Sequence, residues 1–312
     1  MTNYWQSLKR VVNKYWRLIQ YSVVGLAFVL IGITLRTYWN DLSSFDWELS
    51  YPWFVTSLLL VSIVALSMAV WWTLSIRLLQ GQLGWKRGVR IWALSQLAKY
   101  LPGGIWNYAG RVVACDRVGV SKGRAALSLA IETVLRIQAA AVVFLVSLPF
   151  WPKVQWSRAE LVLVVGSLLL GLVALDPHIL SKGIDFILRI LRRPPANIVP
   201  LSYRHLLGLF AGHVLTVAGA GGAFYLMVFS IHPEVPITAA LPMAGMLAVS
   251  VIAGFLNPLT PHGLGTREGL LILLLRYYLP LPVTIVVALL CRLWLTISEL
   301  IGILIVAILL RE

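Results

Sequence analysis

Charge and cysteine are both scarce in this chain of 312 residues. Charged residues make up 12% of it, against roughly 25% in ordinary soluble domains. The two cysteines, Cys115 and Cys291, are too few and too far apart for a disulfide framework or a cysteine-rich metal site. We therefore expect both to be small packing residues.

Catalytic signatures are absent as well. The sequence has no nucleophile elbow, HExxH, P-loop or CxxC motif, and no polar stretch long enough for a soluble catalytic domain. We therefore expect a protein that is not an enzyme and that uses no cofactor and no metal.

Long apolar runs dominate the chain. Apolar residues make up 59% of it, and several nearly uncharged runs are long enough to cross about 30 Å of hydrocarbon. The pattern predicts an all-α polytopic membrane protein with about six transmembrane helices and two re-entrant broken helices. Tyr51, Trp53, Trp71 and Trp72 are expected to be interfacial aromatics at the ends of the second span. The expected spans are residues 18–38, 51–76, 125–150, 161–175, 203–230 and 283–310, and the expected re-entrant elements are residues 91–112 and 237–279.

Basic residues outnumber acidic ones by 26 to 12, which gives a formal net charge of +14. The cations flank apolar runs and form no basic arm or recognition helix, so we expect no nucleic-acid partner. Loops 40–50 and 231–236 contain no lysine or arginine, whereas loop 77–90 contains several. By the positive-inside rule, both termini are expected in the cytoplasm and the protein in the cell (plasma or inner) membrane.

Two similar motifs interrupt the apolar runs about half a chain apart. The first reads Leu101-Pro-Gly-Gly-Ile-Trp-Asn-Tyr-Ala-Gly-Arg111, and the second reads Asn257-Pro-Leu-Thr-Pro-His-Gly-Leu-Gly-Thr-Arg-Glu268. Both place proline and clustered glycine before an arginine. Broken segments at corresponding positions of two halves point to a transport site in a membrane protein. We therefore predict two membrane repeats, residues 1–156 and 157–312, with the second inverted because each half crosses three times.

A phosphate site is the chemistry that these breaks favour. Glycine lets the main chain approach a ligand, and a half-helix that begins at Thr266 would direct free N–H groups and Arg267 toward the break. Alternatively, proline and glycine only turn the chain, and Arg267 pairs with Glu268 or another acid. The candidate residues of the two breaks are Pro102, Gly103, Gly104, Arg111, Pro261, His262, Gly263, Gly265, Arg267 and Glu268.

Four charged residues lie inside predicted spans. Glu132 and Arg136 are four residues apart, and Arg292 and Glu299 are seven apart, so each pair shares a helical face. Each such charge costs about 3 kcal/mol at the bilayer centre unless it is paired. Either they form structural ion pairs within or between the halves, or the arginines contact a lipid phosphate and the glutamates act as their partners or as proton sites.

The two motifs resemble a known family. Leu97-Ala-Lys-Tyr-Leu-Pro-Gly-Gly104 and Pro261-His-Gly-Leu-Gly-Thr-Arg-Glu-Gly269 are similar to the transmembrane domain of lysylphosphatidylglycerol synthases and to its stand-alone flippase-like relatives. The resemblance covers nearly the whole chain and implies movement of aminoacylated phospholipid across the bilayer. In the synthases, a separate soluble domain makes that lipid from phosphatidylglycerol and aminoacyl-tRNA. This chain reaches Glu312 without one, so synthase activity is not expected. Other relatives are linked to polyprenyl-lipid and cell-surface glycan pathways.

The leading hypothesis is therefore a lipid translocase whose partner is an anionic phospholipid or a polyprenyl-linked lipid. Its arginines would guide the phosphate, and its glutamates would hold them or couple to protons. The alternative is a non-transporting scaffold for a glycosyltransferase or lipid-modifying enzyme, with structural arginines. A membrane-embedded enzyme ranks third.

Overall fold

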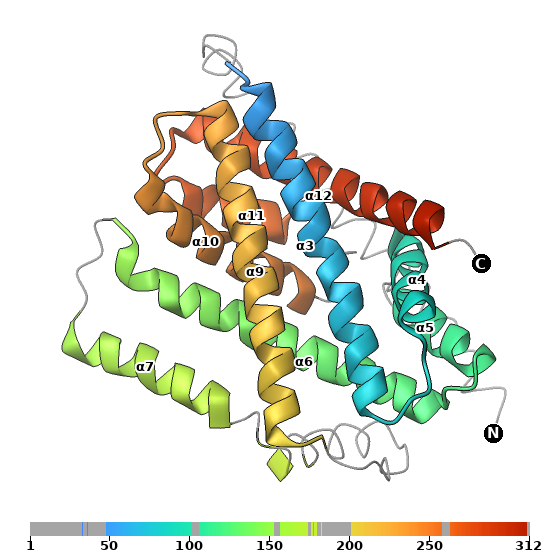
Figure 1. Ribbon diagram of the computed structural model, residues 1–312. Coiled ribbons are helices and arrows are strands. Elements are labelled where there is room, and N and C mark those ends of the chain that lie inside the picture. The colour runs from blue at the N-terminus through green and yellow to red at the C-terminus, as the bar shows by residue number, and fades with distance from the viewer. Residues whose placement is uncertain are drawn as a thin grey trace, which may run out of the picture. The chain divides into compact units, whose positions relative to one another are not determined.

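The computed structural model describes residues 33, 36, 48–100, 106–152, 157–173, 176, 178, 179, 182, 201–257 and 263–310. These residues form α-helices and short 3-10 turns, with no strand among them (Figure 1). The predicted first span lies almost wholly outside this described part. Two compact units are present: Met1–Trp47 with Ser250–Leu290, and Glu48–Val249 with Cys291–Glu312.

Helices α3 (Tyr51–Leu78) and α9 (Tyr203–Ile231) form the antiparallel centre of the larger unit (Figure 1). The N–H of Ser50 donates to the carbonyl of Ser230 at 2.8 Å, which ties the start of α3 to the end of α9. Both helices are apolar around most of their circumference, and at about 1.5 Å per residue each is longer than the hydrocarbon layer.

Helix α6 (Lys122–Ser147) crosses both α3 and α9 (Figure 1). It begins after Ser121, whose hydroxyl accepts the Arg124 N–H at 3.4 Å, and a 3-10 turn containing Pro149, η2 (Leu148–Phe150), follows it. The next helix, α7 (Arg158–Val173), has 16 residues and spans about 24 Å. That length is short for a transmembrane helix, so the predicted span 161–175 is not confirmed.

A helical hairpin occupies the first predicted re-entrant region. Helix α4 (Trp85–Gln96) continues into the 3-10 turn η1 (Leu97–Tyr100), and α5 (Trp106–Arg117) packs back against α4. Each helix has 12 residues and spans only about 18 Å, which is too short to cross a bilayer. The predicted break itself, residues 101–105, lies outside the described residues, so the re-entrant element 91–112 is not confirmed.

Five helices of the described residues are long and apolar enough to cross a membrane: Tyr51–Leu78, Lys122–Phe150, Tyr203–Ile231, Ile237–Leu256 and Leu281–Leu309. Four of these match predicted spans. The fifth, made of η3 (Ile237–Ala239) and α10 (Ala240–Leu256), lies in the predicted re-entrant element 237–279. The predicted break at Asn257 therefore comes after a helix that is long enough to cross the membrane. A re-entrant element would have a helix too short to cross, so the count of six spans and two re-entrant elements is not confirmed.

Tryptophan indoles connect neighbouring helices of the larger unit. Trp72 and Trp294 are fully buried, and their Nε1 groups donate to the hydroxyls of Ser128 and Ser57, each at 3.1 Å. Buried indole N–H groups need such acceptors, and serine supplies them at helix contacts in membranes. The prediction that Trp72 is an interfacial aromatic is therefore wrong: it is a core residue.

Candidate functional site

The larger unit contains an ion pair sealed from its surroundings. Nη1 of Arg111, on α5, lies 2.6 Å from Oε2 of Glu132, on α6, and both side chains are at most 3% exposed. The other carboxylate oxygen, Oε1, accepts the indole N–H of Trp92 at 3.1 Å. Three elements, α4, α5 and α6, thus meet at one carboxylate.

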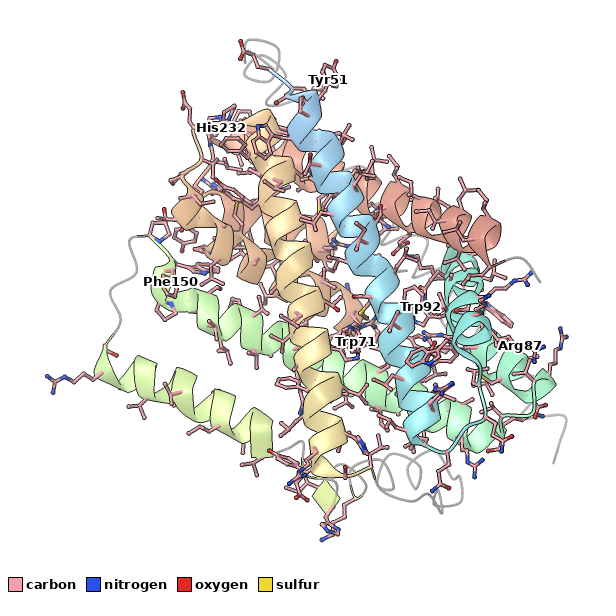
Figure 2. The ribbon with its side chains drawn as sticks, viewed as in Figure 1. Tyr51, Trp71, Arg87, Trp92, Phe150 and His232 are labelled. Carbon is pink, nitrogen blue, oxygen red and sulfur yellow. The ribbon has the colours of Figure 1, made fainter. Side chains whose placement is uncertain are left out.

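Aromatic rings surround the Arg111 guanidinium. Its Cζ lies 5.3 Å from the ring centroid of Tyr108, 5.4 Å from that of Trp72 and 6.0 Å from that of Trp92. Figure 2 shows Trp92 between α3 and α4. Aromatic faces stabilise a guanidinium that has lost its water, so these rings and Glu132 together offset the cost of burying the charge. We call these five residues the Arg111 cluster.

Polar groups without partners adjoin this cluster. Among the described residues, Asn107 Oδ1, Arg111 Nε and His213 Nδ1 are buried and have no hydrogen-bond partner in the structure. Arg136 Nη2 lies 3.5 Å from Tyr108 Oη, at the long limit of a hydrogen bond. A buried polar atom without a partner costs about 1–3 kcal/mol, so such atoms mark places where water or a polar ligand group is stabilising.

A second ion pair joins the hairpin to the last helix. Lys99, on η1, donates to the Glu299 carboxylate on α12 (Leu281–Leu309). This pair is more open than the first, because the two side chains are 15% and 27% exposed. Arg292 lies two turns before Glu299 on the same helix and is partly buried.

The second break lies in the smaller unit. Helix α11 (Thr266–Leu275) begins after Gly265, whose N–H donates to the Glu268 carboxylate at 2.8 Å. Glu268 therefore caps the helix and places a negative charge at its positive end. The Glu268 carboxylate thus competes with any anion that would bind the N–H groups at the start of α11. Arg267, on the first turn of this helix, is partly buried.

Glycine is required where the chain returns to α10. Gly263 has a φ of +67°, and a Cβ on it would lie 2.2 Å from the Cα of Gly254. The main chains approach so closely that no other residue fits without movement. Gly265 also has a positive φ, +82°.

Neither cysteine forms a disulfide and both are buried, as expected of small packing residues. Burial raises the pKa of the Cys115 thiol to about 11, although the nearby Arg111 charge opposes the shift. The thiol is therefore protonated and unreactive near neutral pH.

Residues 17–302 match the family described as lysylphosphatidylglycerol synthase TM region. The chain belongs to this family. No curated protein matches it. Since the match covers nearly the whole chain, the family domain includes the described helices from α3 to α11, α12 as far as Gly302, both breaks, and the ion pairs Arg111–Glu132 and Lys99–Glu299.

Within this family domain, the structure brings some predicted site residues together. Arg111 and Glu132 are in direct contact, and Arg136 lies near Tyr108 in the same unit. Gly263, Gly265, Arg267 and Glu268 gather at the start of α11 in the other unit. Five predicted residues lie outside the described part: Pro102, Gly103, Gly104, Pro261 and His262.

Sequence reasoning did not single out Lys99 or Trp92. Lys99 is a cation in a short apolar segment directly before a break, which is a usable signal because a charge placed there needs a partner. Trp92 lies seven residues earlier, on α4, and no local pattern predicts its contact with Glu132.

Proposed function

We propose that this protein moves an anionic phospholipid or a lipid-linked precursor across the cell membrane. Membership of a family named for the membrane region of a lipid synthase supports a lipid substrate. Several apolar helices support a multi-pass protein in direct contact with lipid. The termini are proposed to be cytoplasmic, following the distribution of lysine and arginine.

The observation that carries the proposal is the charge and polarity of the Arg111 cluster. The cluster contains the charges of Arg111 and Glu132, and Arg136, which lies outside the cluster, adds a positive charge 3.5 Å from its Tyr108 hydroxyl. These charges lie beside buried polar atoms without partners, and Glu132 and Arg136 lie on α6, which is apolar over most of its length. Intramembrane charges of this kind mark substrate or ion pathways in membrane proteins.

In the proposed mechanism, the α4–α5 hairpin is the re-entrant element that admits a headgroup from one side. Arg136 attracts the phosphate, and the Nε–H of Arg111 together with His213, as its Nδ1–H tautomer, replaces part of its water. The second break, with Arg267 and Gly263, serves the other side by the inverted symmetry of the two halves. The acyl or prenyl chains remain in the surrounding lipid.

A scaffold for a lipid-modifying enzyme or glycosyltransferase remains the second candidate, and one observation favours it. The Arg111–Glu132 pair is sealed and ringed by aromatic side chains, as a structural ion pair would be. In that case, the arginines hold helices together, and a partner enzyme performs the chemistry.

Purified protein in vesicles tests the proposal. Vesicles carry a trace of fluorescent phosphatidylglycerol, and a membrane-impermeant reductant then quenches the label in the outer leaflet. We expect the wild-type protein to expose the inner-leaflet label faster than protein-free vesicles do. Arg136→Gln should slow this exposure, because it removes a charge worth about tenfold in binding a phosphate.

The matched control is Arg117→Gln, which removes an exposed cation of α5 outside the Arg111 cluster. It should behave like wild type. Wild-type protein that moves no lipid, together with stoichiometric co-purification of one enzyme, would support the scaffold instead.

A further inference from the structure

Two of the ion pairs that join the hairpin to other described helices, Arg111–Glu132 and Lys99–Glu299, differ in accessibility. The Arg111–Glu132 side chains are 3% and 2% exposed, whereas the Lys99–Glu299 side chains are 15% and 27% exposed. The first pair is locked inside the unit. The second can be reached from outside it.

Exposed apolar side chains lie close in sequence to both members of the open pair. Leu97, two residues before Lys99, and Leu300, directly after Glu299, are each 46% exposed. Exposed leucines on apolar helices are the side chains that face lipid in a membrane protein. The Lys99–Glu299 pair therefore lies at a lipid-accessible edge between η1 and α12.

A phosphate group can compete with the Glu299 carboxylate for Lys99. An ammonium group is a point charge with three donors, and it binds a phosphate as readily as a carboxylate. The pair also connects segments 200 residues apart in the chain, at the turn where the hairpin reaches its break. Exchanging Glu299 for a phosphate would therefore release the hairpin from α12 without leaving the lysine unpaired.

We infer that Lys99 and Glu299 form a latch, at which an anionic phosphate group replaces the Glu299 carboxylate on Lys99 and separates η1 from α12. This inference rests on the proposed function and deepens it: Lys99 is the residue that first binds the headgroup at the lipid edge. Glu299 holds Lys99 when no anion is present and competes with the ligand.

The competition predicts opposite effects for two variants. Lipid retention is measured by native mass spectrometry after exchange into mixed micelles of phosphatidylglycerol and phosphatidylcholine. Lys99→Gln should lower phosphatidylglycerol retention about tenfold, because it removes a charge-assisted hydrogen bond. Glu299→Gln should raise it, because it removes the competitor. Lys86→Gln, at an exposed site on α4, controls for loss of positive charge and should match wild type.

A purely structural ion pair gives a different pattern. Both substitutions would then change retention in the same direction or not at all, and either result overturns the latch. Adding inorganic phosphate identifies the source of the anion. If phosphate displaces phosphatidylglycerol from wild type but not from Lys99→Gln, Lys99 binds free phosphate as well. If it displaces none, the site requires the lipid.

The transport assay separates the two proposals. Opposite effects on retention without any lipid movement would support the latch and refute the translocase. Lipid movement with unchanged retention in both variants would refute the latch and leave the translocase standing.

Discussion

Replacing Glu132 should destabilise the protein more than most single substitutions. In Glu132→Leu, the guanidinium of Arg111 keeps its burial but loses the carboxylate at 2.6 Å. Breaking a buried ion pair in this way costs about 3–5 kcal/mol. Trp92 loses its acceptor as well, which adds about 1 kcal/mol. At roughly 2–4 °C per kcal/mol, the melting temperature should fall by on the order of 10 °C.

The double variant Arg111→Met with Glu132→Leu shows whether the unpaired Arg111 charge causes the loss of stability in Glu132→Leu. It removes both charges and fills the space with apolar side chains, an exchange that is often nearly neutral for stability. Most of the lost stability should therefore return, leaving the cost of the unpaired Trp92 N–H and of the lost ring contacts. The assay is thermal unfolding of the detergent-purified protein, followed by size-exclusion chromatography of heated samples. A double variant as unstable as Glu132→Leu alone would refute this account of the pair.

Glycine contacts give two further predictions, each with its own control. Gly221→Ala should destabilise by about 1–3 kcal/mol, because the new methyl would lie 2.1 Å from the Cβ of Ala244, while Gly222→Ala meets nothing within 4 Å and should be neutral or stabilising in the same thermal assay. Gly263→Ala should disrupt the return to α10, because its φ is +67° and its Cβ would collide with main chain, whereas Gly269→Ala has open space. Similar melting temperatures for either pair of variants would contradict the packing described for that glycine.

Hydropathy predicted the long helices because membrane-crossing length and apolar composition are local properties. The sequence 51–78 shows this, since its apolar run begins at a proline compatible with the first turn and continues without interruption. Asn257 and the proline after it likewise mark the end of α10, and α11 begins at Thr266 as predicted. Local reasoning therefore located the end of α10 and the start of α11, on either side of the second break.

The local sequence did not predict which charged side chains pair with each other. Spacing favoured a contact between Glu132 and Arg136, but the Glu132 carboxylate binds Arg111 because α5 packs against α6. The Lys99–Glu299 contact joins segments 200 residues apart, and only the tertiary fold brings them together. Whether a segment enters and leaves the membrane on the same side also depends on how the helices pack together, which local sequence does not determine.

The most direct measurement is the rate at which purified wild-type protein exposes inner-leaflet phosphatidylglycerol to an outside reductant. The vesicles contain this labelled lipid, and a parallel set contains labelled phosphatidylcholine. We predict faster exposure than in protein-free vesicles, and a larger effect for the anionic lipid than for the zwitterionic one. Exposure no faster than in protein-free vesicles, for both lipids, would contradict the proposal that this protein moves lipid.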